Sequence, residues 1–240
     1  MSRRSWIVLI AAVVLALIGF VGWWGLREAS EQARADRDAA SRERAEREAR
    51  RDGAARSESA DLMPDVLRGL ALGMTLDEVR ASRSAGGASP SAIGASRGPG
   101  FGEPGLSALE EQLPNGARVV YGFRDERLER LQVLSLLPSA EAIGPHLAAM
   151  NARYGTPTGA WDCPQTGGVP TRRFTWRHAR TTVSDVFLIY GGRVSVTLYI
   201  APSSVIAQSL ARSSCRPISA DELEVFPVAT PEQMRGPGSE

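Results

Sequence analysis

Strict alternation of apolar and polar residues predicts strands in the second half of the chain. Residues 193–200 place aliphatic side chains on one face and polar side chains, with Tyr199, on the other. The two-residue turn Gly191-Gly192 joins this strand to residues 181–190, which is typical of a β-hairpin. The same pattern predicts three more strands, at residues 117–123, 128–137 and 172–178.

Helical spacing marks one segment between these strands. Its four apolar residues fall four, three and four positions apart and are Ile143, Leu147, Met150 and Tyr154. Pro145 is the expected first residue of this helix, because a missing backbone N–H is tolerated there. Gly155 is the expected stop.

Capping residues predict two shorter helices upstream. Thr75 and Glu78 form a capping box at the start of the first, and Gly73 provides the freedom to turn into it. Ser107 and Glu110 have the same spacing and predict a helix over residues 107–113. A terminal helix is expected over residues 203–212.

The chain begins with an apolar stretch. Residues 6–26, from Trp6 to Leu26, hold no charged side chain and are long enough to span a bilayer. They predict an uncleaved transmembrane signal anchor behind a short tail, residues 1–5. A cleaved signal peptide is the alternative, although no small-residue cleavage site directly follows the apolar run.

Residues 27–60 are rich in arginine, glutamate, aspartate and alanine. Opposite charges recur at helical spacing, which predicts a solvated, charged helical stalk. A coiled coil is the alternative, but this stretch has no apolar seam.

The remaining pattern predicts an α+β body over residues 61–215, with a flexible, glycine-rich loop at 84–105 and a tail at 216–240. The order is helix-strand-strand, then helix-strand-strand-strand, which indicates a tandem repeat with an antiparallel sheet. The expected fold class is therefore α+β, preceded by a transmembrane helix and a stalk.

Cysteine use suggests an oxidising compartment. Cys163 and Cys215 stand beside prolines in segments expected to be loops, and they predict a disulfide; two unpaired thiols are the alternative. All 28 basic residues are arginine, which is typical of a bacterial chain of GC-rich coding. We expect a single-pass inner-membrane protein with its body in the periplasm; a body in the cytoplasm is the alternative, because more arginines follow the apolar run than precede it.

Composition and motifs exclude several functions. The formal net charge of +1 gives no overall attraction for nucleic acid. Residues 94–98 and 100–105 fit a hydrolase elbow and a dinucleotide loop, but both lack the flanking strand that these motifs need. His146 and His178 have no metal-ligand spacing, so neither a metal nor a cofactor is expected.

Two short stretches carry a resemblance. "LGMTLDEV" at residues 72–79 and "ARYGTP" at residues 152–157 are similar to the α+β repeats of BamE-like outer-membrane assembly lipoproteins and β-lactamase inhibitor proteins. The resemblance implies a noncatalytic domain that binds other proteins.

We therefore expect a membrane-anchored protein that binds or scaffolds a protein of the cell envelope. Trp176, Arg177 and Tyr199 are its candidate interface residues, because aromatic and arginine side chains anchor interfaces. The alternative is an envelope hydrolase with a dispersed site. It would need a histidine beside Cys163, or beside a serine with an aspartate behind it.

Overall fold

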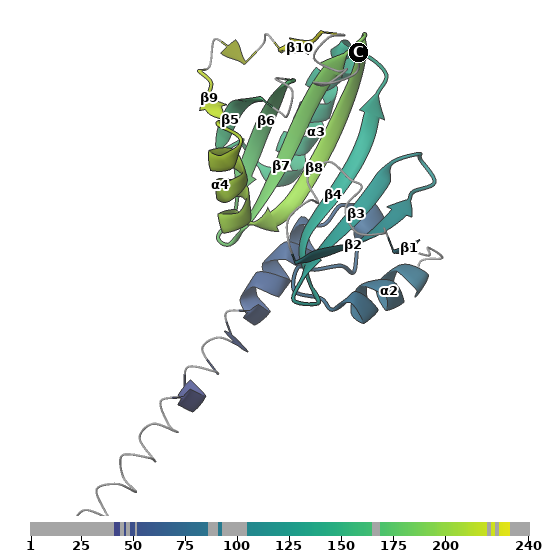
Figure 1. The fold of residues 1–240 in the computed structure, drawn as a ribbon, viewed down its shortest axis with the longest axis vertical. Coiled ribbons are helices and arrows are strands. Elements are labelled where there is room, and N and C mark those ends of the chain that lie inside the picture. Colours follow the sequence, from purple (N-terminus) through teal and green to yellow (C-terminus); the bar gives the residue numbers. More distant parts are fainter. Residues whose placement is uncertain are drawn as a thin grey trace, which may run out of the picture. The chain divides into compact units, whose positions relative to one another are not determined.

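The computed structural model describes residues 41–43, 46, 49–50, 52–85, 91–92, 105–164, 169–219, 222–223 and 226–230. The chain divides into two compact units, residues 1–52 and residues 53–240. The described residues of the first unit are helical. The second unit holds the sheet shown in Figure 1 and includes residues 53–60, the end of the predicted stalk.

The predicted fold class is wrong. Within the described residues, ten strands form one sheet that is antiparallel except at β10, and the helices are few and short. The body is therefore mainly an antiparallel β structure and not the expected α+β tandem behind a transmembrane helix and stalk. Residues 107–113 are expected to be a helix, but residues 107–112 lie in strand β2, because Leu109 and Glu111 alternate into the core.

The predicted localisation is also corrected. No helix in the described part of the chain is long and apolar enough to cross a bilayer. The longest whose bounds are complete, α3, has 12 residues and spans about 18 Å against the roughly 30 Å of a hydrocarbon core. This finding contradicts a single-pass membrane protein. The segment on which that prediction rested, residues 6–26, lies outside the described residues.

The strands follow one path across the sheet, with the long strands β4 and β8 side by side at its centre. In spatial order they are β1 (Ser91–Ala92), β2 (Leu106–Gln112), β3 (Arg118–Arg124), β4 (Arg127–Leu137), β8 (Arg193–Pro202), β7 (Thr181–Tyr190), β6 (Pro170–Arg177), β5 (Gly159–Pro164) and β9 (Arg216–Pro217). The short strand β10 (Val228–Ala229) pairs in parallel with the end of β7.

Helices cover the two faces of this sheet unequally. The helical elements with complete bounds are η1 (Asp65–Leu67), α2 (Leu76–Ala85), η2 (Ala140–Ala142), α3 (Ile143–Tyr154) and α4 (Ser203–Arg212). Helices α2 and α3 cover one face, which we call the α3 face. Helix α4 lies on the opposite face, the α4 face (Figure 1).

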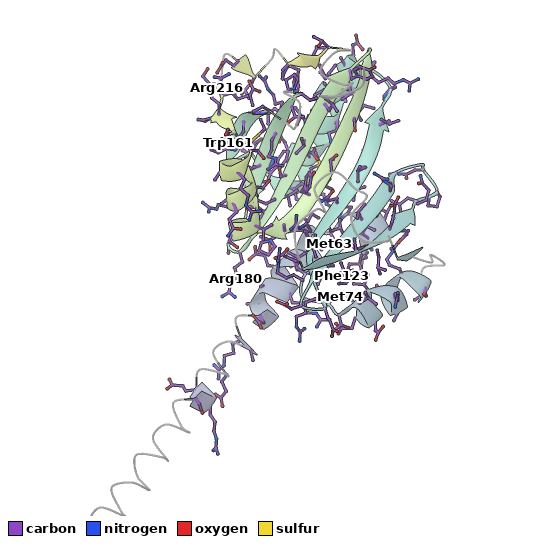
Figure 2. The ribbon with its side chains drawn as sticks, viewed as in Figure 1. Met63, Met74, Phe123, Trp161, Arg180 and Arg216 are labelled. Atoms are coloured by element: carbon purple, nitrogen blue, oxygen red, sulfur yellow. A yellow bond between two sulfur atoms is a disulfide. The ribbon has the colours of Figure 1, made fainter. Side chains whose placement is uncertain are left out.

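The main hydrophobic core lies on the α3 face. Phe174, Trp176 and Phe187 point from β6 and β7 towards α3, and the ring of Tyr154 lies 6.2 Å from that of Trp176. Met63, Met74 and Phe123 belong to the same core (Figure 2).

A buried polar network joins α2 to this core. The Arg83 guanidinium donates two hydrogen bonds to Glu111, at 2.9 and 2.5 Å, and the Tyr121 hydroxyl donates a third at 2.7 Å. Burial opposes ionisation of Glu111, but these donors outweigh it and hold its pKa below the usual value.

Several local predictions are confirmed. Thr75 and Glu78 form the reciprocal capping box, with hydrogen bonds of 2.7 and 3.2 Å, and Gly73 has a φ of +82°. The turn residues Gly191 and Gly192 both have positive φ. The hairpin β3–β4 and helix α4 also form as expected. Helix α3 begins at Ile143, two residues before the predicted start.

Candidate functional site

Two neighbouring arginines on β6 point to opposite faces of the sheet. The side chain of Arg172 enters the α3 face, where it makes a bidentate ion pair with Asp162 at 2.9 and 3.2 Å. It also donates to the backbone carbonyls of Glu222 and Leu223 and lies over the ring of Phe226. This arginine holds the C-terminal segment against the sheet.

Arg173, on the α4 face, has a different environment. It is 8% exposed, yet it makes no ion pair with any described residue. Its Nη1 donates to Ser209 Oγ at 3.2 Å, and its guanidinium lies 5.4 Å from the centre of the Tyr199 ring. Burial lowers the pKa of Arg173 and Tyr199 opposes this, but an arginine remains charged at neutral pH.

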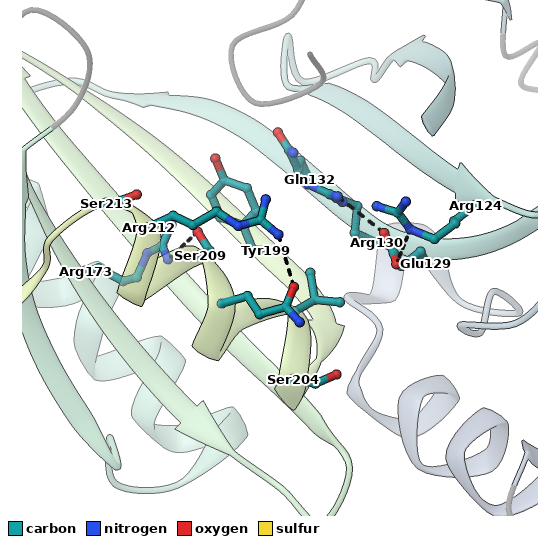
Figure 3. A pocket seen from close by; sticks show the side chains of 12 residues that line it. Arg124, Glu129, Arg130, Gln132, Arg173, Tyr199, Ser204, Ser209, Arg212 and Ser213 are labelled. Atoms are coloured by element: carbon teal, nitrogen blue, oxygen red, sulfur yellow. Dashed lines mark hydrogen bonds and ion pairs between the residues drawn. The ribbon is translucent and has the colours of Figure 1, made fainter. Parts of the chain in front are cut away.

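Arg173 lines a cleft of about 510 Å³ between α4 and the sheet (Figure 3). Its walls carry guanidinium, hydroxyl and amide groups. The lining residues are Arg124, Glu129, Arg130, Gln132, Arg173, Tyr199, Ser204, Val205, Gln208, Ser209, Arg212 and Ser213. The described lining residues include four arginines and a single glutamate, so their formal charge is positive.

The charges are arranged unevenly along the cleft. Glu129 lies at one end, where it pairs with Arg124 at 2.8 Å and with Arg130 at 3.3 Å. Arg173 and Arg212 lie at the other end, near Ser209 (Figure 3). The one carboxylate among the described lining residues is therefore shared by two arginines at one end, and Arg173 and Arg212 line the opposite end.

Helix α4 forms one wall and is fixed at both of its ends. At the N-terminal end, Ser203 donates its backbone N–H to the Arg180 carbonyl at 2.8 Å and its hydroxyl lies 2.9 Å from that of Thr182. Beyond the C-terminal end, the disulfide Cys163–Cys215 ties the chain to β5, with a Cα–Cα distance of 4.2 Å. Only Ile206 of this helix is buried. The predicted disulfide is confirmed, although Cys163 lies in a strand and not in a loop.

The three predicted interface residues have different positions. Trp176 is 1% exposed and donates its indole N–H to the Gly155 carbonyl, so it lies in the core and not on a surface that a partner could contact. Arg177 is exposed at the end of β6, and it lines a second cavity on the far side of α4. Tyr199 is half-buried in the basic cleft, where burial raises its pKa. Only Tyr199 therefore belongs to the cleft.

The candidate catalytic residues do not come together. Cys163 is held in the disulfide and has no free thiol. His146 Nε2 lies 2.8 Å from Oδ2 of the buried Asp185, within the α3 face, and His178 follows β6. The described residues contain no group of three metal-binding side chains. Residues 94–98 and 100–104 lie outside the described residues.

Comparisons with known proteins give no match that could indicate what this cleft binds. No family model matches the chain, no curated protein matches its sequence, and no solved structure matches its fold. The resemblance to BamE-like and β-lactamase-inhibitor repeats therefore remains a prediction, and the function has to be argued from the site.

Proposed function

We propose that this protein is a noncatalytic binding protein that holds an anionic group of its partner in the cleft beneath α4. The observation that carries this proposal is the buried guanidinium of Arg173, which has no acidic partner among the described residues. Removing a charge from water without a counter-charge is costly. A ligand that supplies the missing negative charge offsets that cost.

The chemistry of the lining groups supports binding. Arginine is the side chain best suited to bind carboxylate, sulfate or phosphate oxygens, because its planar guanidinium presents five N–H donors. Hydroxyls from Ser204, Ser209 and Ser213 add further donors along α4. The volume also lies within the roughly 300–1,000 Å³ of small-molecule sites.

The cleft is formed by rigid elements of the fold. Its floor consists of the paired strands β4, β8, β7 and β6, and its helical wall is fixed covalently through Cys215. Groups held on rigid elements lose little freedom when a ligand binds, which favours affinity. A protein that presents the anion on an exposed side chain or terminus would fit this description.

A matched pair of variants tests the proposal. Arg173 and Arg177 lie on the same strand and point to the same face, but only Arg173 lines the basic cleft. We expect millimolar citrate or sulfate to raise the melting temperature of the wild-type protein and of Arg177→Met, because a ligand that binds only the folded state stabilises it. Arg173→Met should lose this response. Equal responses in all three proteins would contradict the proposal.

A further inference from the structure

We infer that the anionic group of the partner is a carboxylate, which Arg173 binds edge-on in the cleft beneath α4. This inference rests on the proposed function and specifies the chemistry of the partner's group. The carboxylate belongs to a protein segment and comes either from an acidic side chain or from the C-terminus. The ion pairs of other buried arginines, the unpartnered donors of the cleft and the balance of charge each support it.

Two other buried arginines show how this fold satisfies a guanidinium. Arg172 donates from Nε and Nη2 to the two carboxylate oxygens of Asp162, at 2.9 and 3.2 Å. Arg83 uses the same edge, Nε and Nη2, to bind both carboxylate oxygens of Glu111. Both contacts are bidentate, because the two N–H groups of this edge match the spacing of the two oxygens of a carboxylate. A carboxylate bound edge-on is therefore the counter-charge that this protein itself gives to these buried arginines.

The corresponding edge of Arg173 has no partner among the described residues. Nη1 donates to Ser209 Oγ at 3.2 Å, whereas Nε is buried without an acceptor and Nη2 makes no hydrogen bond with a described residue. The side chain is 8% exposed and lines the cleft. Nε is shielded from solvent, so edge-on binding needs the guanidinium to turn towards the cleft, and one hydroxyl contact is all that holds Nη1. Because a buried donor without an acceptor costs free energy, a carboxylate that accepts from this edge is stabilised there.

The balance of charge favours one carboxylate over a phosphate. Arg124 and Arg130 share Glu129, and Arg212 is exposed on α4 and keeps its charge in water. Arg173 is buried and has no acidic partner among the described residues, so a single negative charge neutralises it. A phosphomonoester carries about −1.5 to −2 at pH 7, and its excess charge would leave water without compensation, which is costly. In an unmodified protein the anionic groups at neutral pH are carboxylates.

A second unpartnered donor of the cleft favours a protein segment over a free anion. Gln132 is 2% exposed, and its amide nitrogen has no acceptor among the described residues. It pairs in register with Tyr199, whose ring centre lies 5.4 Å from the guanidinium carbon of Arg173 (Figure 3). The amide is neutral and suits a neutral acceptor such as a backbone carbonyl. Since Tyr199 separates the two donors, an anion as small as acetate does not reach both, whereas a segment with a carboxylate and a carbonyl does.

The test is titration of the full chain with matched peptides, followed by NMR through the Nε–Hε signals of its arginines. The probes are four heptapeptides of glycine and serine. Three have both ends blocked and carry a central glutamate, glutamine or phosphoserine, and the fourth keeps a free C-terminal carboxylate. We expect the glutamate probe or the free C-terminus probe to bind about tenfold more tightly than the glutamine and phosphoserine probes. The tighter of these two shows whether the partner's carboxylate is a side chain or a terminus.

Variants separate edge-on binding from attraction by charge alone. The Nε–Hε signal that is missing from Arg173→Lys should move to lower field with the carboxylate probe, because a hydrogen bond to a carboxylate deshields the donated proton. Arg173→Lys keeps the charge but lacks the planar pair of donors, so its affinity for that probe should fall about tenfold. Arg177→Lys, on the same strand and face but not among the residues that line the cleft, should bind as the wild type does. Gln132→Leu should lose about threefold in affinity, with unchanged stabilisation by citrate.

Failure of this inference differs from failure of the proposed function. Tighter binding of the phosphoserine probe, or equal binding of the glutamine probe, would overturn the carboxylate. Wild-type affinity in Arg173→Lys, or an unmoved Nε–Hε signal, would overturn edge-on binding. If no peptide binds but citrate still stabilises the wild type and not Arg173→Met, the protein carboxylate is overturned and the anion site stands. If neither the peptides nor citrate and sulfate have any effect, the proposed function itself is refuted.

Discussion

Arg172 and Arg173 are adjacent in sequence, similarly buried and chemically identical, yet their surroundings differ completely. Arg172 meets a carboxylate, two backbone carbonyls and an aromatic ring. Arg173 meets one hydroxyl and one ring. The contrast separates a charge that is satisfied within the fold from a charge that has no acidic partner among the described residues.

The same difference extends to the two faces of the sheet. On the α3 face the buried arginines are paired, Arg172 with Asp162 and Arg83 with Glu111. On the α4 face, the described lining of the cleft contains four arginines and one glutamate. A buried charge that folding alone does not explain is the feature by which an anion site can be recognised from a structure.

The largest effect on stability is expected from removing the disulfide that ties the end of α4 to the sheet. Replacing both cysteines, Cys163→Ser with Cys215→Ser, should lower the free energy of unfolding by about 4 kcal/mol, because the chain-entropy model assigns about that much to closing a loop of 52 residues. Urea denaturation measures it. The wild-type protein in reducing buffer should give the same loss, and an unchanged midpoint in both would show that the bond does not support the fold.

The next effect distinguishes the two arginines directly. Arg172→Met should lower the free energy of unfolding by about 2 kcal/mol, since it leaves Asp162 and two carbonyls short of a donor. The loss is smaller than for a fully buried ion pair, because Asp162 is partly exposed and keeps its contact with Arg216. Urea denaturation measures this change in the free energy of unfolding. A neutral result would mean that the paired arginine is as dispensable as its neighbour.

A smaller effect should appear in the acid limb of the stability profile. The pKa of Glu111 is lower in the folded protein than its usual value of 4.5, so its contribution is present above that value and is lost as the pH falls below it. Denaturation at several pH values between 6 and 3 should show this loss. Glu111→Gln should be less stable at pH 6 but should change less on acidification. An unchanged acid slope would exclude Glu111 as its source.

Alternation in the sequence predicts correctly those strands whose core-facing positions hold apolar side chains. Strands β3, β4, β7 and β8 follow the expected segments because their core positions hold aliphatic or aromatic side chains. Strand β2 was missed because Glu111 occupies an inward position and pairs there with Arg83, which hides the alternation. The buried ion pair is a long-range contact that no local pattern reveals.

The basic cleft could be predicted only in part. Tyr199 was selected for its aromatic ring and lies in the cleft, but Trp176, selected for the same reason, fills the core. Alternation treats an arginine in a strand as exposed, so the burial of Arg173 under α4 could not be predicted. Adjacent residues of a strand point to opposite faces, so two consecutive arginines place one guanidinium on each face of the sheet. Once both faces are known to be covered, this pattern predicts a buried arginine on each of them.

The most direct test of the central claim is the stability of Arg173→Met, measured beside Arg172→Met by urea denaturation in buffer free of multivalent anions. We predict a free energy of unfolding within about 1 kcal/mol of the wild-type value, or above it, because an apolar side chain of similar length removes an uncompensated charge. The same variant should show no stabilisation by citrate or sulfate. A loss as large as that of Arg172→Met, with anion binding intact, would show that Arg173 serves the fold and would contradict this account.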